Sequence, residues 1–160
     1  MWGNLVFLAI GLGAAPACIN WDLIARRTGD LNALILAAVL QVLGILLPVL
    51  VPGLWSAMLG SLLFGGTFIG MVSLVLSMAG RYYPTMPAKM MGKMTLSYGV
   101  AQILGPALTG MIGAQFGSYN AGLYVAASVM VLGTGLLFVL KVVERRDALA
   151  ESTTGLHHRC

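Results

Sequence analysis

The chain has 160 residues, of which 59% are hydrophobic and 9% are charged, and its net charge is +4. Its mean hydropathy is +0.92. Soluble globular domains carry about 25% charged residues, so this composition excludes that class and indicates a membrane protein. The positive charge does not indicate a nucleic-acid-binding protein, because the basic residues are dispersed among several short segments rather than gathered on one face.

The nine lysines and arginines fall in every second break between the apolar runs of the chain. They are Arg26, Arg27, Arg81, Lys89, Lys93, Lys141, Arg145, Arg146 and Arg159. The breaks between them, at 51–54 and 113–120, carry no charge. Basic loops of membrane proteins are retained in the cytoplasm. The alternation therefore predicts a chain that crosses the bilayer repeatedly, with its N-terminus outside and its C-terminus in the cytoplasm.

The uncharged stretches predict five membrane spans. Residues 31–80 and 94–140 contain no charged side chain, and each is long enough for two spans of about 20 residues and a turn. The predicted spans are about 3–20, 31–51, 54–78, 95–115 and 121–140. They are expected to be helices, because lipid offers no partner to unpaired backbone groups. The predicted fold is thus all-α: a polytopic membrane protein with a transmembrane bundle over 1–140 and a cytoplasmic tail over 141–160.

The first span starts almost without a polar leader, and the N-terminus lacks the basic segment and cleavage site of a signal peptide. An odd number of spans with this abrupt start suggests a piece of a larger protein, since many transporters are built from repeats of three or six spans. Asn4 is a polar residue of this span that could point inward. Aromatic residues stand at predicted span ends, where headgroups favour them: Trp2, Trp21, Trp55, Tyr82, Tyr83 and Tyr119.

The second and third spans carry few polar residues. Gln41 and Thr67 could each point inward. The third span also has a face of small residues, Gly66, Gly70, Ser73 and Ser77. Small faces let helix backbones approach closely, so we expect packing there, with sliding during a conformational cycle as the functional alternative.

The segment between the third and fourth spans contains Pro84 and Pro87, which end the third helix and stiffen the connection. Four methionines cluster at the entry to the next helix: Met86, Met90, Met91 and Met94. Flexible packing is the expected role of this cluster rather than metal binding.

The fourth span has one polar face, formed by Thr95, Tyr98, Gln102 and Thr109. Facing lipid with an unsatisfied amide would cost a few kcal/mol. The face is therefore expected to meet either another helix, through a hydrogen bond worth about 0.6 kcal/mol, or a solute-filled cavity. Gly105-Pro106 would loosen this helix at mid-membrane. Gly105, Thr109 and Gly113 form a second series of small residues.

After the fifth span, Lys141 to Asp147 is expected to extend the helix into water, and Glu151 to Cys160 to form a disordered tail. The two cysteines, Cys18 and Cys160, have no metal or redox spacing, and the terminal His157 to Cys160 segment is expected to be inert. No charged residue or histidine lies within a predicted span. This pattern argues against a proton pump, a voltage sensor or an intramembrane enzyme, so we predict no catalytic residue, cofactor or metal.

The segment Asp22-Leu-Ile-Ala-Arg-Arg-Thr-Gly-Asp30 resembles the loop signature of the major facilitator superfamily, Gly-x-Leu-x-Asp-Arg-x-Gly-Arg. Arg27 and Gly29 match the Arg and Gly of the signature, and Ile24 stands near its Leu. The positions that depart from it are Asp22, Arg26 and Asp30. The segment 98–110, with its Gly-Pro pair, is similar to the eleventh helix of such transporters.

The resemblance implies that the five spans are helices eight to twelve of a bacterial inner-membrane solute carrier working by alternating access. Helices eight, ten and eleven would line the central cavity, which makes Tyr98, Gln102, Thr67 and Asn4 candidate solute contacts. Helices nine and twelve would be peripheral, which gives Gln41 a packing role. The loop residues Asp22, Arg26, Arg27 and Gly29 would gate the cycle.

The implied partners are the lipid bilayer, a small solute and the missing N-terminal half, without nucleic acid. The alternative from another class is a small non-transporting membrane protein that assembles with, or regulates, another membrane protein.

Overall fold

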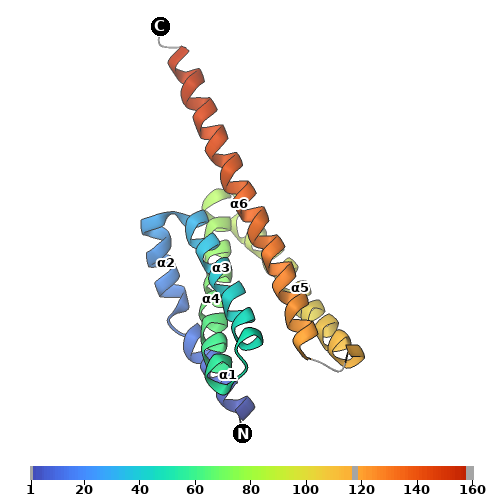
Figure 1. Ribbon diagram of the computed structural model, residues 1–160. Coiled ribbons are helices and arrows are strands. Elements are labelled where there is room, and N and C mark those ends of the chain that lie inside the picture. Colours follow the sequence, from blue (N-terminus) through green and yellow to red (C-terminus); the bar gives the residue numbers. More distant parts are fainter. Residues whose placement is uncertain (1, 117–118, 158–160) are drawn as a thin grey trace.

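The computed structural model describes residues 2–116 and 119–157, and this part of the chain is helical with no strand (Figure 1). The helices are α1 (Trp2–Ala14), α2 (Ala17–Thr28), α3 (Asp30–Leu50), α4 (Leu54–Tyr82), α5 (Pro87–Phe116) and α6 (Tyr119–His157). The predicted all-α class is confirmed.

The helices have the length and composition of a polytopic membrane protein. Asp30–Leu50, Leu54–Tyr82 and Ala121–Arg146 are each long and apolar enough to span a bilayer, and α1 with α2 forms a fourth span if that bent pair crosses as one. Within the described residues α5 does not meet the same criterion. Its Thr, Ser, Gln and Pro residues lower its hydropathy, so three or four spans are supported where five are predicted.

The first predicted span differs most from the structure. It is two helices, bent by 41° at a break around Ala15 and Pro16. Proline cannot donate a backbone hydrogen bond, and it disfavours helical geometry in the residue before it. The second helix then continues to Thr28, so most of the loop predicted over 22–30 is helical. The turn is made at Gly29, whose φ of 92° is readily accessible to glycine.

Trp21 is buried against α4 rather than placed at a span end. Its Nε1 donates a hydrogen bond to the carbonyl oxygen of Gly66 at 2.9 Å. A Cβ at Gly70 would overlap the Trp21 ring. The predicted headgroup position of Trp21 is therefore wrong, because the ring fills a groove that only glycine leaves open. The predicted packing role of Gly66 and Gly70 is confirmed.

Glycines also set the contacts of α4 with α1 and α3. A Cβ at Gly65 would overlap the backbone of Ile10 in α1. A Cβ at Gly60 would lie 2.7 Å from the carbonyl oxygen of Gly44 in α3. Helix α4 thus holds α1, α2 and α3 at close range and is the centre of the bundle (Figure 1).

Helices α5 and α6 pair with each other, and α6 also packs against α3. Figure 1 shows α5 diverging from α4 toward its C-terminal end, and α6 extending well beyond the other helices. The helical extension after Leu140 is as predicted, but α6 continues to His157 where a disordered tail was predicted from Glu151. Ser118, His158, Arg159 and Cys160 lie outside the described residues.

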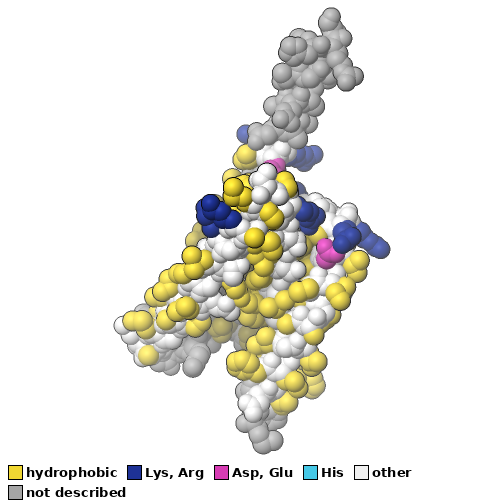
Figure 2. Space-filling view, turned by 180° about the vertical axis from the view of Figure 1, so that it is seen from behind, with side chains coloured by type: hydrophobic (Ala, Val, Ile, Leu, Met, Phe, Trp, Pro, Cys, Tyr) yellow, Lys and Arg dark blue, Asp and Glu magenta, His cyan; other side chains and the backbone are white. Residues whose placement is uncertain are grey.

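The basic side chains gather at one end of the bundle. Figure 2 shows the lysines and arginines of that face in a band at the level where α6 leaves the bundle. At this end Asp30, Tyr82, Lys141, Glu144 and Arg145 line one recess. The basic segments, which recur at every second break along the sequence, therefore lie at the same end of the helix bundle.

The Trp21 contact generates a test of the fold. Gly70→Ala forces the Trp21 ring or its helix to shift, and overpacking of this kind costs about 1–3 kcal/mol. Gly110→Ala is the matched control, since nothing lies within 4 Å of its Cβ and alanine is about 1 kcal/mol better than glycine in a helix interior. Denaturant unfolding in mixed micelles measures both. Equal stability of the two variants would contradict the packing.

Candidate functional site

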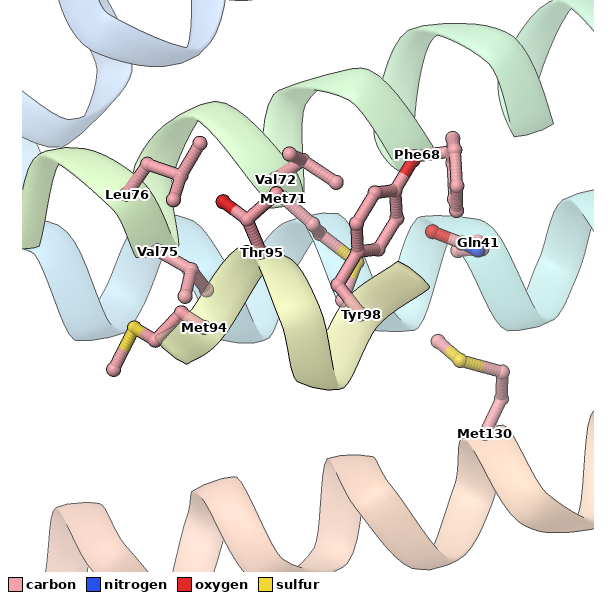
Figure 3. Close-up of a pocket in the computed structure, with 10 residues that line it drawn as sticks. All are labelled: Gln41, Phe68, Met71, Val72, Val75, Leu76, Met94, Thr95, Tyr98 and Met130. Atoms are coloured by element: carbon pink, nitrogen blue, oxygen red, sulfur yellow. The ribbon is translucent and has the colours of Figure 1, made fainter. Parts of the chain in front are cut away.

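A cavity of about 280 Å³ lies between α3, α4, α5 and α6 (Figure 3). Its lining residues are Gln41 from α3; Phe68, Met71, Val72, Val75 and Leu76 from α4; Met94, Thr95 and Tyr98 from α5; and Met130 from α6. No charged side chain is among them. The walls are therefore apolar apart from an amide, a hydroxyl and a phenol.

The cavity lies near the middle of the helices. Gln41 follows Asp30, the first residue of α3, by 11 positions. At about 1.5 Å per residue this is roughly 16 Å along the helix, about half of a hydrocarbon core of roughly 30 Å. A polar group at this depth is far from bulk water and depends on the protein or a ligand for its hydrogen bonds.

The two polar groups from α5 are arranged differently. Tyr98 is half-buried, and its ring lies 5.9 Å from the Phe68 ring, centroid to centroid, at 41°. Figure 3 shows the Tyr98 ring between the backbones of α5 and α4. The Thr95 hydroxyl donates to the carbonyl oxygen of Met91 at 2.9 Å, so its proton is used within α5. Tyr98 is the better placed of the two to contact a molecule in the cavity.

Gln41 is the most unusual residue of the site. Its exposed fraction is 5%, and its Oε1 has no hydrogen-bond partner within the described part of the chain. Leaving such a group unpaired costs about 1–3 kcal/mol. Figure 3 shows its amide projecting from α3 toward the space that Phe68, Tyr98 and Met130 border. The expected packing role of Gln41 leaves this acceptor without a hydrogen bond.

The polar face predicted on α5 is divided by the structure. Thr95 and Tyr98 line the cavity, whereas Gln102 is exposed and is not among the lining residues. Thr109 donates to the carbonyl oxygen of Gly105 at 3.0 Å and packs near Gly122 of α6. The division follows from the divergence of α5 from α4.

The other predicted solute contacts lie apart from the cavity. Thr67 is 3% exposed, and its hydroxyl donates to the carbonyl oxygen of Leu63 at 2.7 Å. Asn4 is exposed near the start of α1. Of the four predicted solute contacts, Tyr98 alone lines this cavity. Gln41 was assigned to packing because the resemblance made its helix peripheral. The signal that could have identified it is a single amide in an otherwise apolar helix core.

The predicted gating residues stand at the basic end of the bundle. The Arg26 Nε lies 2.7 Å from an Asp22 carboxylate oxygen, one helical turn away. Arg81 at the end of α4 pairs with Asp30 at the start of α3 at 2.9 Å, a contact that the sequence did not indicate. Arg27 is exposed and takes part in neither of these ion pairs, the two that are found among the described residues. Its guanidinium is available to a further partner.

The chemistry of the cavity is that of binding. Three thioethers, from Met71, Met94 and Met130, and two aromatic rings, from Phe68 and Tyr98, form polarisable walls. Within the described residues no group of three or more His, Cys, Asp or Glu side chains is placed to hold a metal ion. The described cavity offers hydrogen-bonding groups and apolar surface to a small molecule.

Comparison with known proteins places the chain beside a transporter family. Residues 1–138 match the family model described as "Uncharacterised MFS-type transporter YbfB", where MFS denotes the major facilitator superfamily. No curated protein and no solved structure matches the chain. The match covers all helices from α1 to α5 and most of the apolar part of α6.

Proposed function

Because the chain belongs to the family of MFS-type transporters represented by YbfB, we propose that it moves a small solute across a membrane by alternating access. The observation that carries the proposal is the family match over residues 1–138. The apolar helices and the mid-depth cavity lined by Tyr98 are compatible with it. Transport by alternating access requires neither an enzyme activity nor a cofactor.

The exposed side of α5 supports a role as one half of a larger transporter. Gln102 is exposed there, and nothing lies within 4 Å of a Cβ at Gly99, Gly105 or Gly110. An amide facing lipid is costly, and small residues on a transmembrane helix favour close helix contacts. We therefore propose that this side faces a second bundle, helices one to seven, across the solute path, and that the chain supplies helices eight to twelve.

The proposed location is a bacterial inner membrane, with the basic end of the bundle in the cytoplasm. In a variant lacking Cys18 and Cys160, Thr85→Cys at the basic end and Pro52→Cys at the other end give a matched pair of exposed positions. An impermeant thiol reagent should label position 52 in intact cells, and position 85 only after the membrane is opened. Labelling of position 85 in intact cells would show that the basic end of the bundle faces outward, opposite to the proposed orientation.

We assign gating to the segment Asp22, Arg26, Arg27 and Gly29. Arg27 is the free guanidinium there and is suited to the cytoplasmic end of a neighbouring helix, where backbone carbonyls favour a cation. In the complete transporter that contains this chain, Arg27→Ala should slow turnover several-fold and leave equilibrium solute binding nearly unchanged. Arg146→Ala, on the projecting part of α6, is the control. Lost binding with normal turnover would contradict gating.

The solute path is tested at Tyr98 and Gln102. If both contact solute, Tyr98→Phe and Gln102→Leu should lower transport by the complete transporter while leaving its abundance in the membrane normal. Each removes a hydrogen bond worth about 0.5–1.5 kcal/mol, so a loss of roughly threefold to tenfold is expected. Leu96→Ala, an exposed residue of the same helix, is the control.

Two outcomes separate the roles of these residues. Reduced transport by Tyr98→Phe alone would place the solute in the cavity and remove Gln102 from the path. Normal transport and abundance in both variants would leave Tyr98 and Gln102 with packing roles only and would remove both from the solute path.

A further inference from the structure

We propose that the cavity between α3, α4, α5 and α6 is a binding site for an uncharged aromatic molecule with one hydrogen-bond donor. The Gln41 Oε1 would accept the hydrogen bond from that donor. Its lining residues come from four helices of this chain, so binding can be tested without the second bundle invoked above. The inference goes beyond the proposed function and does not depend on transport, because binding can be measured by itself.

The hydrogen-bonding requirement comes from Gln41. Its buried Oε1 is an acceptor without a partner among the described residues. A ligand that donates a hydrogen bond restores the unmade one at this depth. Met130 and Phe68 offer no donor, and the Tyr98 hydroxyl, which also lines the cavity, does not bond to this oxygen. The ligand should therefore carry a hydroxyl or N–H group rather than an ether or ester oxygen alone.

The walls define the rest of the ligand. Phe68 and Tyr98 favour offset or tilted contacts with another ring, and the sulfur atoms of Met71 and Met130 favour contact with aromatic rings. A charged ligand would lose its hydration without a countercharge, since no ionisable side chain other than the Tyr98 phenol lines the cavity. The volume of about 280 Å³ is at the lower end of small-molecule pockets, which indicates a molecule of one or two rings.

The probes are 2-naphthol, which donates a hydrogen bond, and 2-methoxynaphthalene, which does not. Equilibrium dialysis against the purified full chain in detergent micelles measures both, and empty micelles give the correction for partitioning. The wild type should bind 2-naphthol about tenfold more tightly than the methyl ether, as expected for one buried hydrogen bond. Equal binding of the two probes, or binding of neither, would overturn the proposal.

The variants assign the preference to Gln41. Gln41→Met keeps the length of the side chain and removes the acceptor, and Gln41→Leu is the second choice if that variant is unstable. Either should bind both probes with similar affinity, because only the hydrogen bond is lost. Persistence of the 2-naphthol preference in a folded variant would show that Gln41 is not the acceptor.

A filling variant locates the probes in the cavity. Val75→Phe adds a ring inside it and should weaken binding of both probes at least tenfold. Val100→Phe makes the same change at an exposed position of α5 and should leave both affinities unchanged. If Val75→Phe binds like the wild type, the probes occupy another site and the proposal fails. If the complete transporter moves no solute while this chain still binds 2-naphthol as expected, the result would count against the proposed function alone.

Discussion

The arrangement of the bundle depends on the close approach of other helices to the glycine positions of α4. In a bilayer, lipid tails are as apolar as side chains, so helices associate through tight van der Waals contact rather than through the hydrophobic effect. Gly60, Gly65 and Gly70 permit that contact with α3, α1 and Trp21 of α2. The hydrogen bond from the Trp21 indole to the Gly66 carbonyl fixes the register of α2 along α4, because an indole N–H within the bundle has few other acceptors.

The cavity is a consequence of the same helix having two unlike sides. Residues two positions apart on a helix lie about 200° apart, so Phe68 and Val72 stand nearly opposite Gly66 and Gly70. Bulky side chains on this second side keep α5 and α6 at a distance that the glycine side does not impose on α1 and α2. The short connection at Gly29 and the Arg81–Asp30 ion pair then fix the ends of α3 and α4 at the basic end. The space that remains between α3, α4, α5 and α6 is the cavity described above.

The sequence predicted what depends on composition and on the periodicity of one helix. Hydropathy placed the ends of α3 and α4 within a few residues, and helical spacing identified the small face at Gly66 and Gly70. It misplaced Trp21, because residues 22–28 are compatible with a helix as well as with a loop, and the break at Pro16 was overlooked. It did not indicate that Gln41 lines a cavity with an unpartnered acceptor. Periodicity states which side chains share a face, but only tertiary packing decides which neighbour that face meets.

Helix α5 unites the two proposals, because its two parts have different surroundings. Its first part brings Tyr98 against Phe68 and closes the cavity. Farther along, Pro106 has no N–H to donate to the Gln102 carbonyl, so both the backbone and the side chain of Gln102 need partners at the same depth. Lipid supplies none, and Gln102 is exposed. The second bundle proposed above would supply those partners. Gln102 lies four residues after Tyr98 and so on the same face of α5, and it is left uncovered because α5 diverges from α4 beyond the cavity.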